Sequence, residues 1–331
     1  MGIGISLGIS PRESFTDWKG FIEALDRREV DRLWLIDSQL AMKDVFAGLL
    51  TAALNSRRLQ LGTGVTNVIT RHPTVTANAI AAISELSGGR AVLGLGAGDS
   101  AVFGIGKRPS RVADVEEAVR FFRAVLGGGE GRWEDRSYRL PVATAPVKVF
   151  LAVSQPRMCA LAGRLADGAI IMGPAQPDLL ARQLGWIEQG LSECGRDRSE
   201  LEVSFIATVS MGEDPDTALA DVRAWATGQA RLLADFKELP GSLEPFGEEI
   251  IHAKDSYDYS EHLSTRAGHA GAISDELVRA LAITGSPADC RDRLRALLDV
   301  GIDDLVFPLM GGGRLERLDR LTTELVQQLQ V

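Results

Sequence analysis

The segments LQLGTGVTN (residues 59–67) and AVLGLGAGD (residues 91–99) are two short apolar runs that each end in glycines and polar side chains. Between them, Pro73 stands where a helix should begin. Proline suits the first helical turn, because the amide that it lacks has no partner there. A strand, a helix and a second strand in this order predict a right-handed crossover between parallel strands at residues 59–63 and 91–96. The unit indicates an α/β fold with glycine-rich strand ends.

The same alternation continues along the rest of the chain. Apolar runs predict eight strands, at residues 3–7, 33–36, 59–63, 91–96, 149–153, 169–172, 202–209 and 304–309. Helical patterns separate nearly all of them, at residues 14–28, 44–55, 112–126, 156–165, 178–193 and 315–329, besides the helix that begins near Pro73. A small hairpin is expected within residues 133–140.

Eight strands joined by helices fit either a closed barrel or an open, doubly wound sheet. An open dinucleotide-binding sheet needs a GxGxxG turn at the start of a helix, followed by an acidic residue for the ribose. Residues 94–98 give only GxGxG, well before the next helix, and suit a barrel rim where backbone approaches a ligand. We therefore predict a (β/α)8 TIM barrel over residues 1–331 as a single domain, with an insertion or lid at residues 214–286 between the seventh and eighth strands.

Composition sets limits on location and partners. Of the 331 residues, 45% are hydrophobic and 24% are charged, with a net charge of −9, as in ordinary soluble proteins. Basic residues are scattered, so no nucleic acid is expected as a partner. The three cysteines form no CxxC pair, which suits a reducing cytosol. No secretory signal and no membrane-spanning run are recognised, so we expect a cytoplasmic protein.

In a barrel, functional residues stand at the C-terminal ends of the strands. Here these positions are rich in glycine and hydroxyl groups, without the paired carboxylates of a hydrolase or the ligands of a metal site. Such a site suits a small-molecule enzyme whose flat cofactor carries the chemistry itself. The candidate cofactor-binding residues are Thr63, Gly64, Val65, Asn67, Gly96, Gly98, Asp99, Ser154, Gln155, Arg157 and Gly173.

Ser154, Gln155 and Arg157 open a helix after the fifth strand. The free amides of that helix, its dipole and the arginine make a site for a cofactor phosphate, and Gly173 adds amides after the sixth strand. An ordinary capped helix with a solvated arginine fits these residues equally well.

The candidate catalytic residues are Asp37, which follows the second strand, and His262 and His269 in the insertion. Histidines beside tyrosines and acidic residues, in a segment over a barrel mouth, are typical of a lid that contacts substrate. A solvated polar loop explains the same composition equally well.

At this point the residues resemble a known family. Residues 63–67 and 70–73, TGVTN and TRHP, resemble the third-strand segment of the luciferase-like flavin superfamily. Within it, they are most similar to coenzyme F420-dependent methylene-tetrahydromethanopterin reductases. The likeness extends to residues 94–99, 162–170, 284–290 and 301–303, and so over most of the chain.

The resemblance implies a barrel with a reduced flavin or deazaflavin at its mouth, a cis peptide bond between Gly64 and Val65, and a homodimer or higher homo-oligomer. It implies hydride transfer between F420 and an organic substrate. The methanopterin reductases carry an acidic residue where this chain has Ser6, which counts against methanopterin as the substrate. An FMN-dependent monooxygenase, which uses oxygen and reduced flavin from a separate flavin reductase, is therefore an alternative. A non-catalytic flavin-binding relative is the third.

Overall fold

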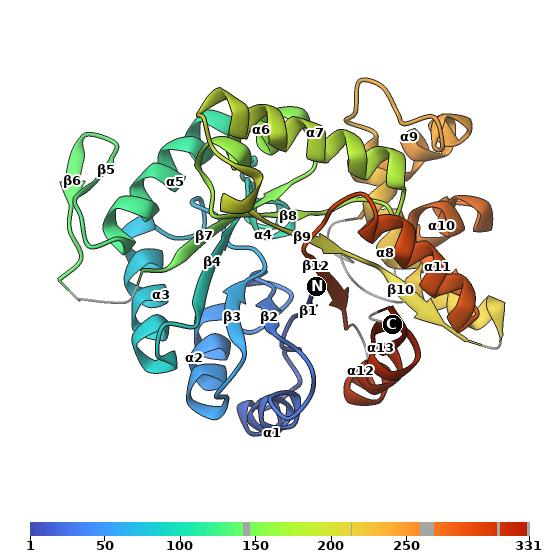
Figure 1. Ribbon diagram of the computed structural model, residues 1–331, viewed down its shortest axis with the longest axis horizontal. Coiled ribbons are helices and arrows are strands. Elements are labelled where there is room, and N and C mark those ends of the chain that lie inside the picture. The colour runs from blue at the N-terminus through green and yellow to red at the C-terminus, as the bar shows by residue number, and fades with distance from the viewer. Residues whose placement is uncertain (142–145, 213, 259–267, 310–311, 330–331) are drawn as a thin grey trace.

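Eight parallel strands close into a barrel with helices around it (Figure 1). The computed structural model describes residues 1–331 apart from 142–145, 213, 259–267, 310–311 and 330–331, and without the side chains of 269–270. Around the barrel the strands follow the order β1 (Gly2–Leu7), β12 (Asp304–Pro308), β9 (Glu202–Ile206), β8 (Gly168–Ile171), β7 (Lys148–Val153), β4 (Ala91–Leu95), β3 (Gln60–Thr63) and β2 (Arg32–Leu35). The predicted (β/α)8 barrel is confirmed.

Helices follow the strands and cover the outside of the barrel. They are α1 (Phe15–Leu25), α2 (Val45–Asn55), α3 (Pro73–Ser87), α5 (Val112–Leu126), α6 (Pro156–Leu165), α7 (Pro177–Glu193), α11 (Pro287–Leu298), α12 (Arg314–Leu321) and α13 (Gln327–Leu329). The four-residue helix α4 (Ser100–Phe103) instead lies at the strand ends, where Gln39 donates to the carbonyl of Ala101 at 2.7 Å. Capping side chains and prolines determine where these helices begin. Ser14 and Asp17 form a reciprocal capping box on α1, and Pro73 occupies the first turn of α3.

Inside the barrel, Trp34 and Phe150 fill space that glycines on neighbouring strands leave open. A Cβ added to Gly62 would lie 2.4 Å from the ring of Trp34, and one on Gly168 would lie 2.3 Å from the ring of Phe150. The two aromatic rings join buried aliphatic side chains in an interior cluster of Trp34, Val92, Phe150, Ile170, Ile206 and Val306. The barrel is therefore a packed core, and only its ends are open for a ligand.

A buried ionic network closes the N-terminal end of the barrel. Arg32 donates to Glu202 at 2.5 Å and to Asp304 at 3.0 Å, and its guanidinium also lies over the interior aromatic rings. Burial, with a hydrogen bond and charge repulsion from Glu202, raises the pKa of Asp304 to about 6. Burial alone would also raise the pKa of Glu202, but its bonds to Asp304 and Arg32 outweigh this and lower it.

Residues between β9 and α11 form a separate subdomain. It contains β10 (Val209–Met211), α8 (Pro215–Leu233), α9 (Gly247–Asp255), α10 (Asp275–Leu281) and β11 (Ile283–Gly285), and it has its own apolar cluster. The sequence predicts a seventh strand as far as residue 209, but barrel pairing ends at Ile206, and the chain resumes as β10, which pairs in parallel with β11.

Two smaller features complete the description. β5 (Gly131–Trp133) and β6 (Arg136–Tyr138) form the antiparallel hairpin expected near residues 133–140. In the part of the chain that the structure describes, no helix has the length and apolar character needed to cross a membrane.

Candidate active site

The chain leaves β3 in an irregular turn at the barrel mouth. The peptide bond between Gly64 and Val65 is cis, as the family resemblance implies. The hydroxyl of Thr63 donates to the carbonyl of Gly94 at 2.7 Å and accepts from the Gly94 amide at 3.0 Å. The amide of Thr66 donates to the same carbonyl at 3.0 Å. These bonds hold the ends of β3 and β4 side by side, so the side chain of Thr63 is used within the protein.

Glycines at this turn allow the backbone to pack closely against neighbouring side chains. A Cβ on Gly64 would lie 2.7 Å from the Cβ of Trp34, and a Cβ on Gly96 would lie 2.8 Å from Cγ2 of Val65. Val65 is only partly buried and packs on the interior cluster. Gly98 has a φ of 98°, a conformation that favours glycine. The strand ends thus present backbone and one apolar side chain, a surface that a planar ring can lie against.

Asp37 supports the turn from β2. Its side chain is 2% exposed, and Oδ2 accepts from Oγ1 of Thr66 at 2.7 Å and from Nη1 of Arg71 at 2.5 Å. Arg71 also donates to Asp44 at 3.2 Å. Burial alone would lower the pKa of Arg71, but the bonds and charges of Asp37 and Asp44 outweigh burial and raise it. The contacts of Asp37 therefore position the β3 turn.

Asn67 and Asp99 connect neighbouring segments. Oδ1 of Asn67 accepts from the amides of Ile69 and Thr70, both at 2.9 Å, and so closes the loop after the turn. Oδ2 of Asp99 accepts from Nη2 of Arg231 on α8 at 2.7 Å. This ion pair joins the loop after β4 to the inserted subdomain across the mouth.

Ser154, Gln155 and Arg157 lie at the start of α6, where Arg157 is exposed. Gln155 makes no side-chain cap on the helix, so its side chain does not occupy the first-turn amides. Gln183 connects this end with the sixth strand end, because its Nε2 donates to the carbonyl of Ser154 at 3.0 Å and lies 3.6 Å from where a Cβ on Gly173 would stand. The structure therefore brings Ser154, Gln155 and Gly173 together.

The structure describes no side-chain contacts for the two histidines that the sequence analysis proposes as catalytic. His262 lies outside the described residues, and of His269 only the backbone is described, in the short turn Gly268–Ala272. His72 caps α3, and its Nδ1 lies 2.7 Å from Oγ1 of Thr74. Among the described residues, no group of three or more His, Cys, Asp or Glu side chains could hold a metal ion.

α8 brings two residues to the mouth that sequence reasoning does not single out. Nε2 of Gln229 donates to the carbonyl of Gly173 at 3.1 Å and to Oγ1 of Thr208 at 3.4 Å. Trp225, one turn earlier on the same helix face, packs on the interior cluster, as Val65 does. An amphipathic pattern predicts the helix, but nothing in that pattern tells which face meets the barrel.

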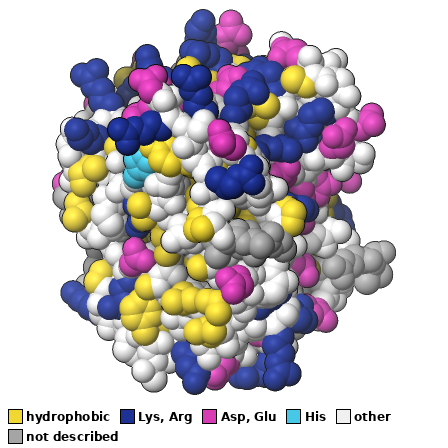
Figure 2. All heavy atoms as spheres, turned by 90° about the vertical axis from the view of Figure 1, so that its left-hand side faces the viewer, with side chains coloured by type: hydrophobic (Ala, Val, Ile, Leu, Met, Phe, Trp, Pro, Cys, Tyr) yellow, Lys and Arg dark blue, Asp and Glu magenta, His cyan; other side chains and the backbone are white. Residues whose placement is uncertain are grey.

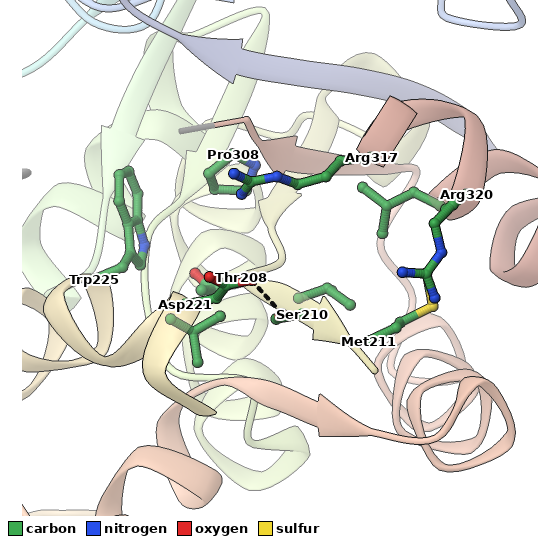
Figure 3. A pocket seen from close by; sticks show the side chains of 11 residues that line it. Thr208, Ser210, Met211, Asp221, Trp225, Pro308, Arg317 and Arg320 are labelled. Atoms are coloured by element: carbon green, nitrogen blue, oxygen red, sulfur yellow. Dashed lines mark hydrogen bonds between the residues drawn. The ribbon is translucent and has the colours of Figure 1, made fainter. Parts of the chain in front are cut away.

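A pocket of about 170 Å³ opens beside Trp225 (Figure 3). It belongs to the C-terminal side of the barrel, because Thr208 follows β9 and Pro308 ends β12. Its walls come from the β9–β10 segment, α8, the end of β12 and α12. The lining residues are Thr208, Val209, Ser210, Met211, Asp221, Val222, Trp225, Pro308, Arg317, Arg320 and Leu321.

Comparison with known proteins places this geometry in context. The sequence model of the family described as luciferase-like monooxygenase matches residues 3–304. The 5,10-methylenetetrahydromethanopterin reductase of Methanolobus tindarius is 29% identical over 86% of this chain and 88% of its own length. The F420-dependent glucose-6-phosphate dehydrogenase of Intrasporangium calvum is 28% identical over 85% of this chain and 83% of its own.

Solved structures share the architecture. The coenzyme F420-dependent tetrahydromethanopterin reductase of Methanopyrus kandleri superposes with a TM-score of 0.78 at 22% identity, over 99% of this chain and all of that one. The oxygenating constituent of 3,6-diketocamphane monooxygenase from Pseudomonas putida, in complex with FMN, gives a TM-score of 0.68 at 18% identity, over 99% of each chain.

Proposed function

Because this chain belongs to the luciferase-like monooxygenase family, we propose that it transfers hydride between coenzyme F420 and a small organic substrate at the barrel mouth. One observation carries the choice of F420 over FMN. The sequence relatives described above, a methylenetetrahydromethanopterin reductase and an F420-dependent glucose-6-phosphate dehydrogenase, are 29% and 28% identical to this chain. Among the solved structures, the F420-dependent reductase is 22% identical with a TM-score of 0.78, and the FMN-bound monooxygenase is 18% identical with a TM-score of 0.68.

The residues at the mouth fit a planar deazaflavin ring. Gly64 and Gly96 have no side chains there, and Val65 offers an apolar face, so the ring is assigned to the ends of β3 and β4. F420, when bound, supplies a two-electron hydride carrier. The chain itself has to bind the ring, orient the substrate beside it and exclude water, which is where most of its contribution to the rate would lie.

The remaining predicted residues take supporting roles in this proposal. Ser154, Gln155, Arg157 and Gly173 are assigned to the cofactor phosphate, because the uncapped start of α6 presents amides and a positive dipole end. Asp37 acts through Thr66 and Arg71, and is a positioning residue. His262 and His269 are proposed to face the substrate, where one donates a proton or a hydrogen bond.

An FMN-dependent monooxygenase is the second candidate, and Ser6 is the observation that favours it. Ser6 is 2% exposed near the C-terminal end of β1, beside Trp34 on β2. The departure from the acidic residue of the methanopterin reductases thus falls at the mouth end of the barrel. In this alternative a separate reductase delivers reduced FMN, and oxygen is consumed.

We also propose that the protein is a homodimer or higher homo-oligomer, through the outer faces of α2 and α3. Leu50 and Leu54 on α2 are 39% and 63% exposed, and Val75 and Leu86 on α3 are 57% and 49% exposed. Figure 2, turned to that side of the barrel, shows hydrophobic side chains gathered on the lower half of the face. Apolar area of this kind is what a partner subunit would cover.

Parallel fluorescence titrations with F420 and FMN test the proposal. We expect F420 to bind at least about tenfold more tightly, which corresponds to ~1.4 kcal/mol. We also expect the protein to oxidise reduced F420 without oxygen when an acceptor substrate is supplied. Tighter FMN binding with oxygen consumption would support the monooxygenase instead. Binding of a cofactor without turnover of any substrate would indicate the non-catalytic relative.

A further inference from the structure

The pocket beside Trp225 lies across the barrel mouth from the wall assigned to the cofactor. The circular order of the eight strands places β9 opposite β3. Trp225 and Val65 pack on the same interior cluster, so both walls rest on the same layer of buried side chains. A substrate that meets a ring on Val65 would therefore extend toward the pocket above β9 and β12.

Arg317 brings a positive charge to this pocket that no described carboxylate neutralises. α12 carries three arginines, and two of them are ion-paired: Arg314 with Glu13 at 2.5 Å and Arg320 with Glu324 at 2.9 Å. Within the described part of the chain, the hydrogen bond that Arg317 makes is donated to a carbonyl, at 2.9 Å. Arginine presents several donors in a planar fork that matches carboxylate and phosphate groups, and here most of that fork is available.

The close view shows how Arg317 lies relative to the other walls. In Figure 3 its side chain reaches from α12 across the upper side of the pocket to Pro308, facing Trp225. On the other side, Oγ of Ser210 donates to Oδ2 of Asp221 at 3.2 Å. The pocket therefore has a cationic wall, an acidic wall and an aromatic side chain at its inner end.

We propose that this pocket holds the anionic end of the substrate, with Arg317 as the anchoring cation and Trp225 against the adjoining apolar part. The word substrate here rests on the hydride-transfer function proposed above. The volume of about 170 Å³ is below the ~300–1,000 Å³ of whole-ligand pockets, so the site takes an end group, a carboxylate or a phosphate. Asp221 keeps the anion on the arginine side and accepts from any donor group that the substrate carries.

The test uses the full chain with F420 bound and three probes: benzoate, its neutral counterpart benzamide, and inorganic phosphate. Binding is followed by calorimetry and by tryptophan fluorescence. We expect benzoate to bind at least about tenfold more tightly than benzamide, the loss typical of one charge-assisted hydrogen bond. Raising the salt concentration should weaken the binding of benzoate and leave the binding of benzamide nearly unchanged. Tighter binding of phosphate than of benzoate would identify the substrate as a phosphate ester. Tighter binding of benzoate would identify it as an organic acid.

Variants on opposite walls should change the affinity in opposite directions. Arg317→Met should remove the preference for benzoate over benzamide, and Arg317→Lys should restore part of it. Asp221→Asn should strengthen benzoate binding, because it removes a neighbouring negative charge. Arg120→Met is the matched control, since Arg120 is exposed on α5 and paired with Glu116 at 2.8 Å.

Three results would overturn the proposal: equal binding of benzoate and benzamide, unchanged benzoate affinity in Arg317→Met, or an equal loss in Arg120→Met. F420 affinity is measured in the same variants and should not change. If the chain binds no F420 but keeps the Arg317-dependent preference for benzoate, the function proposed above fails while the anion site stands.

Discussion

Asp304→Asn should change how the stability of the barrel depends on pH. Asp304 lies at the N-terminal end of the barrel, bonded to Arg32 at 3.0 Å and to Oγ of Ser204 at 3.2 Å. Its side chain is 15% exposed. Asparagine has nearly the same shape and no charge, so the substitution replaces a titrating group by one that resembles the protonated acid.

The expected magnitude follows from the shift in pKa. Burial and Glu202 raise the pKa of Asp304 from 3.8 to about 6, and one unit of pKa is equivalent to ~1.4 kcal/mol. Below about pH 4 the acid is protonated in both states. Between about pH 4 and 6 the folded state keeps a proton that the unfolded chain has lost, so stability from this group is lost as pH rises through about 6. The contribution of Asp304 to the free energy of unfolding therefore changes by up to about 3 kcal/mol over this range.

Glu202 titrates in a different window and does not obscure the effect. Its folded pKa is lowered from 4.5, so its contribution is present above that value and is lost only as the pH falls below it. Between pH 5.5 and 7.5 Glu202 is ionised in both states, so the change over that part of the range comes from Asp304.

Urea unfolding followed by tryptophan fluorescence at pH 4.5, 5.5, 6.5 and 7.5 measures the effect. The unfolding free energy of Asp304→Asn minus that of the wild type should rise by about 2 kcal/mol from pH 4.5 to pH 7.5, because part of the total change already occurs below pH 4.5. Asp135→Asn, at a fully exposed position, is the control and should follow the wild type at every pH. A difference that stays constant with pH would show that the pKa of Asp304 is not raised. A difference that falls would show that the charge of Arg32 dominates.

Three further predictions concern the mouth. Gly96→Ala should weaken F420 binding by about 1–3 kcal/mol in titrations, because its Cβ would lie 2.8 Å from Val65, whereas Gly20→Ala, with open space around it, should leave affinity unchanged. Asp37→Asn should lower the unfolding free energy by about 3 kcal/mol and also reduce F420 affinity, since Arg71 loses its buried partner. A loss of stability with unchanged F420 affinity would show that Asp37 does not act on the cofactor site. Arg157→Ala should cost about 1–3 kcal/mol of cofactor affinity, and an equal loss with a cofactor analogue that lacks the phosphate would contradict the assignment.

Periodicity was sufficient to predict the alternation of strands and helices, because each strand is a short apolar run and most of them are bounded by a helix. The choice of a closed barrel over an open sheet rested on residues 94–98, which lack the GxGxxG turn of a dinucleotide-binding sheet. The sequence pattern did not predict β10 and β11, because each strand has three residues and ends in or near glycine, which resembles a turn. The pairing of Arg32 with Glu202 and Asp304 escaped for another reason. Each stands at the start of its strand, and only closure of the barrel brings together groups that are 170 and 272 residues apart in sequence.

The candidate site shows the same division. The glycine turns at β3 and β4 were visible in sequence because glycine is the only residue whose lack of a side chain leaves room there, and the cis bond followed from the resemblance. The contacts that α8 makes with the mouth were not visible, because Trp225 and Gln229 look like any one-turn pair on an amphipathic helix. Their role depends on how the subdomain packs against the barrel.

The two halves of the mouth make different demands on the chain. A cofactor that carries the electrons needs a flat wall and an anion site, and the proposed function assigns these to backbone and glycine at the ends of β3, β4 and β7. Discrimination among substrates needs side chains, and in our proposal these are Trp225 and Arg317, which α8 and α12 bring to the pocket at the ends of β9 and β12. Substitutions at Arg317 should therefore raise KM for an anionic substrate with little change in cofactor affinity, whereas Gly96→Ala should lower cofactor affinity for every substrate. If both substitutions changed cofactor affinity alike, the mouth would be one undivided site, and the assignment of ring and substrate to opposite walls would be wrong.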